Sequence, residues 1–359
     1  MKLMTVIGTR PEIIKMSCLI ELFNKKFDHI LVHTGQHYDP ELDNNIFADL
    51  KLARPKVRLK TGSGSFSGQL SKLSKQIEET YLKHKPDYVV VQGDTNTAFV
   101  GALVAARLKI KVIHVEAGAR SGNVNAPEEQ NRKMIDTIST YYFSSDKQSY
   151  LNLKREGRSK NLFNVGSTLF DSLKRSSKLA PKNAHLDYNL QKERFVLLTL
   201  HRAENTNDIQ IFLNKINFIN KVAKNIPILF SIHPRTKKLL RKLKIKLGKN
   251  IIIDKPLPHL TFLSLLKNCR FVLTDSGGVQ EEAAFFNRPC LILRNETEWM
   301  RLINAKKNFL LKKLDKKALN FVEKVIFDDK FYQKIRSRKG AESVAGASRM
   351  IIKKLSQIK

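Results

Sequence analysis

Polar residues suited to acid–base chemistry stand directly after short apolar runs along the chain. Asp94, Glu116 and Glu128 supply carboxylates in the first half, and His201 follows an apolar run in the second half. Carboxylates and imidazole rings are the side chains that most often transfer protons in enzymes. Each one alone is typical of a helix cap or a salt bridge. Together with Arg10 and Lys15, the three carboxylates indicate a polar site.

A second set of residues suits an anionic ligand. Gly8 and Pro11 mark a turn from a strand into a helix, and Arg10 and Lys15 place two cations beside that turn. The N–H groups at the start of a helix attract an anion, and nearby cations add to the attraction. An ordinary turn accounts for Gly8 and Pro11 but not for the two cations, so the pattern favours a phosphate site.

The second half of the chain repeats this arrangement. Ser276, Gly277 and Gly278 follow an apolar run, and Glu282 lies one helical turn further on. Paired glycines let backbone amides approach a pyrophosphate, and an acidic residue one turn later can bind a ribose diol. His233 follows a neighbouring apolar run and is a candidate for the same ligand.

The elements that must position these residues alternate between short β-branched runs and longer helical patterns. The predicted strands are Lys2–Ile7, His29–His33, Tyr88–Gln92, Lys111–Val115, Tyr141–Phe143, Phe195–Leu200, Ile228–Ile232, Ile251–Asp254, Phe271–Thr274 and Cys290–Leu293. The clearest predicted helices are Gly68–His84, Asn96–Leu108 and Ile209–Lys224. Such alternation predicts an α/β fold with parallel sheets and right-handed crossovers.

A polar segment at residues 174–194 interrupts this series and is predicted to be a linker. It separates an N-terminal Rossmann-like domain, residues 1–173, from a C-terminal nucleotide-binding Rossmann-like domain, residues 195–342. The basic amphipathic helix at residues 343–359 is expected to pack back on the first domain. Two doubly wound domains are expected to face each other across a cleft, since ligands bind at the carboxyl ends of such sheets.

Composition excludes several classes of protein. The 359 residues include 42% hydrophobic and 27% charged residues, which is typical of a globular protein. No apolar run reaches the length that spans a bilayer, and charges interrupt the start of the chain, so a cytoplasmic protein is expected. Cys18, Cys269 and Cys290 are far apart and are expected to be reduced thiols. No Walker A, HExxH, GxSxG or complete GxGxxG pattern occurs.

The formal net charge is +32, from 65 basic and 33 acidic residues. Such an excess can bind nucleic acid or an anionic membrane. The lysines are spread along the chain with few aromatic residues among them, so no stacking platform is visible. A general lysine bias on solvated surfaces explains the charge, with attraction of an anionic substrate as a second interpretation.

The chain resembles the non-hydrolysing UDP-N-acetylglucosamine 2-epimerase family through motifs that occur in the family's order. They are GTRPEIIK (Gly8–Lys15), TGQH (Thr34–His37), QGDTNT (Gln92–Thr97), HVEAGAR (His114–Arg120), PEEQNR (Pro127–Arg132), HRAEN (His201–Asn205), HPR (His233–Arg235) and TDSGGVQEE (Thr274–Glu282). The motifs span roughly the first 300 residues and are specific as a set. The resemblance implies a GT-B type fold with the active site between two domains.

The resemblance also implies roles for single residues. The catalytic motif positions are those of Asp94, Glu116, Glu128 and His201. The substrate-binding positions are Arg10 and Lys15 at the diphosphate, Ser276, Gly277 and Gly278 in the phosphate-binding turn, Glu282 at the ribose, Leu257 and Phe262 at the uracil, and His233.

The implied reaction is the reversible epimerisation of UDP-N-acetylglucosamine to UDP-N-acetylmannosamine, a precursor for cell-surface polysaccharides or glycans. It would eliminate UDP to give 2-acetamidoglucal and then add UDP back. Nothing is oxidised overall, so neither a nicotinamide cofactor nor a metal is expected. A UDP-sugar is the expected partner, without nucleic acid, and the resemblance suggests a homodimer.

The sequence departs from the family pattern at one informative point. Trp299 stands where the family's Thr-Glu-Arg-Pro-Glu motif has an arginine, as in relatives that epimerise UDP-2,3-diacetamido-glucuronic acid. That sugar nucleotide is therefore an alternative substrate. The loop Thr61–Gln69 lacks the Arg-Gln pair that some bacterial members use for allosteric activation. A glycosyltransferase or hydrolysing epimerase of the same fold, and a nucleic-acid-binding protein, are further alternatives.

Overall fold

The computed structural model describes residues 1–36, 46–62, 64–338 and 346–358. His37 and the start of the predicted C-terminal helix, at Ser343, lie outside the described residues. The chain forms two compact units. Unit 1 comprises residues 1–178 together with residues 343–359, and unit 2 comprises residues 179–342.

Unit 1 is built on a seven-stranded parallel sheet in the order β3-β2-β1-β4-β5-β6-β7. The strands are β1 (Lys2–Ile7), β2 (Asp28–His33), β3 (Val57–Arg58), β4 (Tyr88–Gln92), β5 (Lys111–Val115), β6 (Tyr141–Ser144) and β7 (Leu162–Asn164). The helices are α1 (Arg10–Lys26), α3 (Phe66–His84), α4 (Asn96–Arg107), α5 (Pro127–Ile138), α6 (Lys147–Arg155), α7 (Thr168–Leu179) and α16 (Ala347–Leu355).

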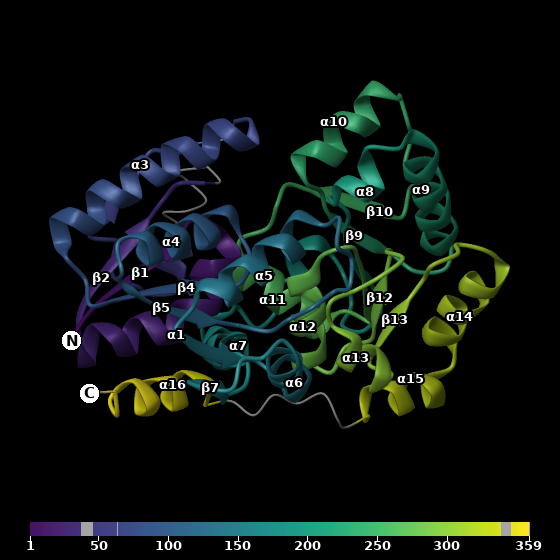
Figure 1. The fold of residues 1–359 in the computed structure, drawn as a ribbon. Helices are drawn as coiled ribbons and strands as arrows, with labels where there is room; N and C mark the ends of the chain where they lie inside the picture. The colour runs from purple at the N-terminus through teal and green to yellow at the C-terminus, as the bar shows by residue number, and fades with distance from the viewer. Residues whose placement is uncertain (37–45, 63, 339–345, 359) are drawn as a thin grey trace. The chain divides into compact units, whose positions relative to one another are not determined.

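Helices cover both faces of this sheet, which explains why its central strands are continuously apolar. α3, α4 and α5 pack on one face through a core that includes Leu73, Ile77 and Ile135 (Figure 1). On α1, Ser17 bonds to Ser172 of α7 through their hydroxyl groups, at 2.9 Å. Both helices therefore belong to the same layer of the unit.

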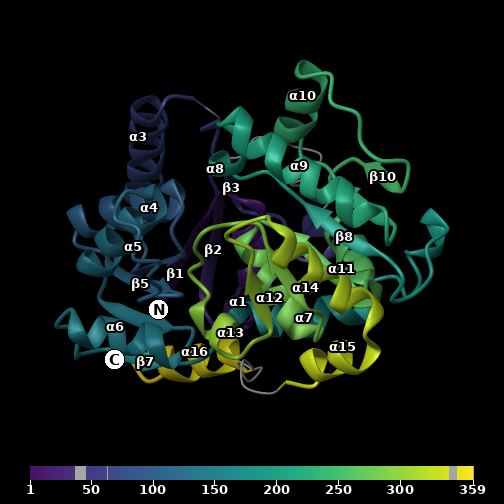
Figure 2. The same cartoon turned by 90° about the vertical axis from the view of Figure 1, so that its right-hand side faces the viewer.

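The C-terminal helix α16 packs on unit 1. It lies beside β7 in both views (Figures 1 and 2), where the Lys354 ammonium stands 5.2 Å from the centre of the Phe163 ring. Asp171 of α7 accepts hydrogen bonds from the backbone N–H groups of Gly346 and Ser348 and so fixes the start of the helix. The last described helix of the chain thus completes the unit that contains the first strand.

Unit 2 contains a six-stranded parallel sheet in the order β10-β9-β8-β11-β12-β13. The strands are β8 (Val196–Thr199), β9 (Ile228–Ser231), β10 (Ile251–Asp254), β11 (Phe271–Thr274), β12 (Cys290–Ile292) and β13 (Asn308–Leu310). The helices are the 3₁₀ turn η1 (Leu186–Tyr188), α8 (Ala203–Thr206), α9 (Ile209–Ala223), α10 (Pro234–Lys242), α11 (His259–Asn268), α12 (Gly277–Phe285), α13 (Met300–Asn304), α14 (Lys316–Phe327) and α15 (Asp329–Arg336).

Two apolar clusters cover the two faces of this sheet. One contains Phe212 of α9 and Val322 of α14, and the other contains Leu266 of α11 and Ala283 of α12. Cys269 and Cys290 are buried among these residues, and all three cysteines are free thiols.

The prediction of an α/β fold with two parallel Rossmann-like sheets is confirmed. The segment predicted to be a linker is partly structured: α7 continues past Lys174 to Leu179, and Ala184 and Leu190 are buried against the core of unit 2. No helix among the described residues is both long enough and apolar enough to span a membrane.

Candidate active site

In each unit several candidate residues follow the strands between which the strand order reverses. The order reverses between β1 and β4 in unit 1, and between β8 and β11 in unit 2. At such a point the connections on the two sides turn away from each other and leave room for a ligand beyond the carboxyl ends of the strands. Asp94 follows β4, Glu116 follows β5, and His201 and Asp275 follow β8 and β11.

Glu116 has an unusual backbone conformation and a paired side chain. Its φ is +70°, in the left-handed region that a non-glycine residue seldom adopts, and its N–H bonds to the Phe143 carbonyl at 2.9 Å. Both carboxylate oxygens lie 2.8 Å from the Lys15 ammonium, and Gln92 donates to one of them at 2.5 Å. The pair is mostly buried, with 14% of the Lys15 side chain and 12% of the Glu116 side chain exposed.

Asp94 is the more exposed of these two carboxylates, with 28% of its side chain accessible. It pairs with Arg132 of α5 at 2.5 Å, while Arg132 also contacts the buried Glu129 at 2.8 Å. Asn131 donates to the Asp94 carbonyl at 2.9 Å. The motif that follows Pro127 therefore orients the turn that carries Asp94.

Glu128 and Glu129 are neighbours with different environments. Glu129 is buried and accepts hydrogen bonds from the backbone and hydroxyl of Ser121, at 2.8 and 3.1 Å. Glu128, the predicted catalytic residue, lies half-buried in the first turn of α5. Arg10, predicted to contact the diphosphate, is the first residue of α1 and is also half-buried.

Glu12 is a buried carboxylate that sequence reasoning missed. One of its oxygens accepts hydrogen bonds from Gly8 N, Thr9 N and Thr9 Oγ1 at 2.8–2.9 Å, and the other accepts from Thr95 Oγ1 at 2.8 Å. It therefore ties the turn after β1 to the turn that carries Asp94. Burial raises the pKa of Glu12 to about 7, against the lowering effect of these donors. The Thr-x-x-Glu spacing of a capping box is the signal that could have identified it.

Gly8 is required by packing. A Cβ atom at this position would lie 2.2 Å from Thr34 Oγ1 and 2.3 Å from Thr97 Oγ1. Those two hydroxyls bond to each other at 2.8 Å, and Gln36 accepts from the Thr97 hydroxyl at 2.8 Å. The turn after β1 thus packs without a gap against the start of α4.

In unit 2, Asp275 organises the turn after β8. It is fully buried and accepts hydrogen bonds from the N–H groups of His201 and Arg202, both at 2.8 Å, and from Asn205 Nδ2 at 2.9 Å. Burial alone would raise the pKa of Asp275, but hydrogen bonding and the charge of His201 outweigh it and hold the pKa below its usual value.

His201 is oriented by this carboxylate. Its Nδ1 lies 3.1 Å from Asp275 Oδ1, and 34% of its side chain is exposed. Donation from Nδ1 leaves Nε2 as the nitrogen that can exchange a proton or bond to a ligand. The exposed ring of His233 lies 5.6 Å from the His201 ring, so these two predicted residues lie together.

The start of α12 carries the predicted phosphate-binding turn. The Ser276 N–H donates to Thr274 Oγ1 at 3.0 Å. A Cβ at Gly277 would lie 2.2 Å from Glu298 Oε1, whereas one at Gly278 would meet nothing within 4 Å. A side chain at Gly277 would therefore displace the Glu298 carboxylate, whereas Gly278 leaves open space.

The remaining predicted residues of unit 2 are buried. Leu257 and Phe262, predicted to contact uracil, belong to the same apolar cluster, and Glu282 is buried in the second turn of α12. Trp299 is also buried and packs with Ala284 and Leu302.

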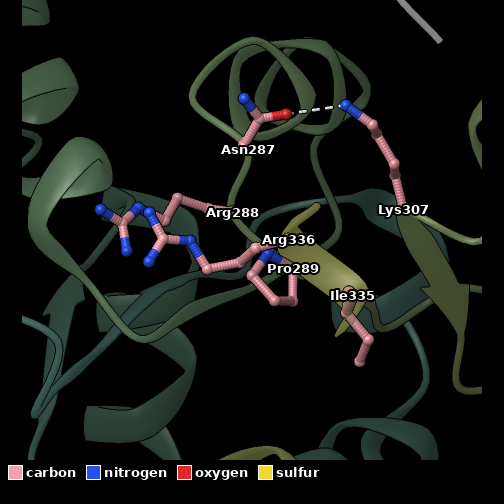
Figure 3. Close-up of a pocket in the computed structure, with 6 residues that line it drawn as sticks. All are labelled: Asn287, Arg288, Pro289, Lys307, Ile335 and Arg336. Carbon is pink, nitrogen blue, oxygen red and sulfur yellow. Dashed lines mark hydrogen bonds between the residues drawn. The ribbon is translucent and has the colours of Figure 1, made fainter. Parts of the chain in front are cut away.

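A pocket elsewhere in unit 2 contains none of the predicted residues. Its lining includes Arg288, Pro289 and Arg336, at the amino end of β12 and so at the opposite edge of the sheet from Ser276 (Figure 3). Glu193 accepts from both arginines, at 2.7 and 3.0 Å. These contacts explain how two guanidinium groups lie side by side, and they give the pocket a structural role.

The described residues contain no group of three or more His, Cys, Asp or Glu side chains placed to hold a metal ion. The polar atoms at the two strand-order reversals are instead arranged as ion pairs and hydrogen-bonded carboxylates. This arrangement can accept and donate protons, balance a developing positive charge, and bind an anion.

The chain is similar in sequence to enzymes that epimerise nucleotide sugars. A UDP-N-acetylglucosamine 2-epimerase from Methanocaldococcus jannaschii is 44% identical over 335 residues, which cover 90% of this chain and 92% of that protein. A UDP-2,3-diacetamido-2,3-dideoxy-D-glucuronate 2-epimerase from Pseudomonas aeruginosa is 36% identical and covers 87% of this chain and 88% of its own length.

The fold is similar to that of a solved relative. A crystal structure of Methanocaldococcus jannaschii UDP-GlcNAc 2-epimerase in complex with UDP-GlcNAc and UDP superposes with a TM-score of 0.90 at 41% identity, over 99% of both chains. A sequence profile of the family UDP-N-acetylglucosamine 2-epimerase matches residues 21–356. The chain therefore belongs to the UDP-N-acetylglucosamine 2-epimerase family.

Proposed function

We propose that the protein interconverts UDP-N-acetylglucosamine and UDP-N-acetylmannosamine by eliminating UDP and adding it back. The observation that carries the proposal is a pair of carboxylates after β4 and β5: Asp94 pairs with Arg132, and Glu116 pairs with Lys15. The chain is also 41% identical to an enzyme crystallised with UDP-GlcNAc and UDP. The product would enter the synthesis of cell-surface polysaccharides or glycans.

The reaction needs carboxylates because the hydrogen at C2 is not adjacent to a carbonyl group. Departure of UDP from C1 gives that carbon oxocarbenium character, which makes the C2 hydrogen acidic. A carboxylate near the ring stabilises the cation and another removes the proton, as carboxylate pairs do in glycoside hydrolysis. We assign these roles to Asp94, Glu116 and Glu128 in unit 1.

The leaving diphosphate needs positive charge and N–H donors. We assign Arg10 and Lys15 in unit 1 to this task, together with the start of α12 at Ser276, Gly277 and Gly278 in unit 2. His201 is supported as a further hydrogen-bonding group, since its contact with Asp275 through Nδ1 orients the ring and leaves Nε2 for a ligand.

Binding of the nucleoside is assigned to the remaining predicted residues of unit 2. Glu282 would bind the ribose, and Leu257 with Phe262 would contact uracil. Both apolar side chains are buried, with 4% of Leu257 and 8% of Phe262 exposed, so they would contact the base through their edges. His233 is assigned to substrate binding because its ring lies beside His201.

The alternative substrate is UDP-2,3-diacetamido-glucuronic acid, since the relative that acts on it is 36% identical. Trp299 is the residue of this chain that favours it, although burial against Leu302 directs the ring into the protein. The chemistry at C2 would be the same. The two substrates differ at C3 and C6, so a comparison of turnover decides between them.

The test is proton NMR of the purified protein with UDP-N-acetylglucosamine in deuterated water, without added metal or nicotinamide. We expect deuterium at C2 and a new anomeric signal from UDP-N-acetylmannosamine. The Asp94→Asn variant, purified in the same way, controls for contaminating activity. Turnover of the diacetamido-uronate alone would reject the first substrate, and release of free sugar would indicate a hydrolysing enzyme.

We further propose a homodimer, which light scattering of the protein at micromolar concentration tests. A mass of twice 41.1 kDa is expected, and a mass of 41.1 kDa would reject the dimer.

A further inference from the structure

Asp136 of α5 is a buried carboxylate that has no part in the roles assigned above. Only 1% of its side chain is exposed, and it accepts three hydrogen bonds from β5 and the turn that follows it. The donors are His114 Nδ1 at 2.7 Å, Gly118 N at 3.1 Å and Arg120 Nη2 at 2.7 Å. Asp136 therefore holds both sides of Glu116, which lies between His114 and Gly118 in the chain.

His114 extends this contact to the neighbouring strand. Its ring is fully buried, and its Nε2 lies 2.9 Å from the carbonyl oxygen of Gly93, the residue before Asp94. A carbonyl oxygen only accepts hydrogen bonds, so Nε2 carries a proton. A chain of two hydrogen bonds thus joins Asp136, through His114, to the turn after β4.

The second ring nitrogen also faces an acceptor. The charges of His114 and Arg120 outweigh the effect of burial and hold the pKa of Asp136 below its usual value, so this side chain is a carboxylate and His114 Nδ1 donates to it. A second carboxylate, Glu156, accepts from Arg120 at 2.6 and 2.8 Å. Arg120 therefore links the buried Asp136 to Glu156, whose side chain is exposed.

Of the turns held in this way, the one after β5 is strained at Glu116, whereas glycine supplies the other positive φ angles. Glu116 has φ +70° and Gly118 has φ +81°, and a Cβ at Gly118 would lie 2.2 Å from the Ser149 carbonyl oxygen. Gly93 has φ +70°. A non-glycine residue in this region costs about 1–2 kcal/mol, so Glu116 adopts it only where the surroundings enforce it.

We propose that Asp136 and His114 are positioning residues, which fix the relative placement of the Asp94 and Glu116 carboxylates without touching the substrate. The inference rests on the proposed function, in which both carboxylates act at the sugar ring. Displacement of a catalytic group by about 1 Å can reduce the rate about 100-fold. Loss of the chain is therefore expected to lower kcat and to leave nucleotide binding unchanged.

The first experiment measures steady-state kinetics of Asp136→Asn with UDP-N-acetylglucosamine and the Kd for UDP. In asparagine an NH2 group, which donates and does not accept, replaces one of the two carboxylate oxygens. The hydrogen bonds from His114 and from Arg120, which reach different oxygens of Asp136, therefore cannot both be kept. We expect kcat to fall about 100-fold, with KM and the Kd for UDP within about two-fold of the original values. The matched control is Asp146→Asn, which changes a carboxylate that caps α6 in the same unit.

The second experiment separates hydrogen bonding from packing at His114. Leucine and glutamine fill similar volumes, but only glutamine can donate to the Gly93 carbonyl. His114→Gln is expected to retain about ten times more kcat than His114→Leu. Equal activity of the two variants, with both folded by circular dichroism, would show that His114 only fills space and would overturn the inference.

A third measurement does not depend on turnover. In ¹⁵N-histidine-labelled protein, His114 should show two slowly exchanging ring N–H signals, which His114→Gln removes and Asp136→Asn changes. If the original protein converts no UDP-sugar, the proposed function is rejected. The ring N–H signals of His114 still show whether both of its ring nitrogens donate hydrogen bonds. A single ring N–H signal from His114, or one unchanged in Asp136→Asn, would overturn the inference.

Discussion

Single residues in the candidate site have their charges compensated by the chain itself. Lys15 pairs with Glu116, Arg132 pairs with Asp94, and His201 contacts Asp275. The role that we assign to Lys15 at the diphosphate and its contact with Glu116 use the same ammonium group. A substrate that attracts Lys15 would therefore compete with Glu116 for the same ammonium group.

Replacing Asp94 by asparagine tests this arrangement at one residue. Arg132 would keep its contact with Glu129, so the fold should survive. Because the negative charge matters most when positive charge develops on the sugar, we expect kcat to fall by about 10²- to 10⁴-fold. The Kd for UDP, measured by calorimetry, should remain nearly the same. A comparable loss of UDP binding would show that Asp94 is structural.

Glu12 predicts a pH dependence of stability. Its pKa in the folded protein is about 7, against an ordinary value of 4.5, so the folded state binds more protons than the unfolded state between these values. Glu12 therefore makes its full contribution to the free energy of unfolding below pH 4.5. This contribution, about 3 kcal/mol at most, is lost as the pH rises through 7.

Urea unfolding of the original protein and of Glu12→Gln across this pH range measures the contribution. As the pH rises from 5 to 8, the unfolding free energy of the original protein should fall relative to that of Glu12→Gln. Parallel curves for the two proteins would contradict a raised pKa.

At the scale of elements, the turn between β5 and α5 depends on glycine in two different ways. A Cβ at Gly118 would collide with the Ser149 carbonyl on α6, whereas one at Gly122 would meet nothing within 4 Å. Both residues have a similar positive φ, of +81° and +80°. Alanine at Gly122 therefore measures the loss of stability from the backbone conformation alone. Alanine at Gly118 adds the loss of stability from the collision.

We expect Gly122→Ala to lower the unfolding free energy by about 1 kcal/mol, the cost of a left-handed alanine. Gly118→Ala should cost at least about 3 kcal/mol, because α6 must also move. Chemical denaturation of both variants provides the comparison. Equal losses would mean that the contact between this turn and α6 is loose.

The elements also show what sequence could predict. Strand ends were predictable because β-branched runs such as Tyr88–Gln92 stop at glycine, and polar residues at those ends indicated the site. The strands β3, β7 and β13 have only two or three residues, too few for a periodic pattern, and were missed.

Within the site, Asp136 shows the limit of sequence reasoning. It lies in the last turn of α5, where an acidic residue usually faces solvent, and its partner His114 is 22 positions away. No local spacing indicates that the two meet. Burial and long-range hydrogen bonding decide its role, and both depend on how α5 packs against β5.

For the molecule as a whole, the net charge of +32 gives a prediction about kinetics. A diphosphate approaches a strongly positive protein faster at low ionic strength, because salt screens the attraction. We expect kcat/KM to fall between 20 and 300 mM salt while kcat stays constant. A salt-independent kcat/KM would mean that the charge serves no role in capture of the substrate.

The helix α16 predicts how the units depend on the ends of the chain. Removal of residues 346–359 would expose apolar surface under Ile351 and Leu355, and Asp171 would lose both of its N–H donors. We expect hydrogen–deuterium exchange to increase in unit 1, with unit 2 largely unchanged. An equal increase in both units would show that α16 stabilises the molecule in another way.

The placement of α16 also constrains how the protein can be made. Unit 1 begins with residue 1 and includes residues 343–359, so the whole of unit 2 is synthesised between its two parts. All residues of unit 2 are therefore made before unit 1 is complete, because unit 1 also needs residues 343–359. A chain cut before residue 343 would contain every residue of the second unit but not every residue of the first.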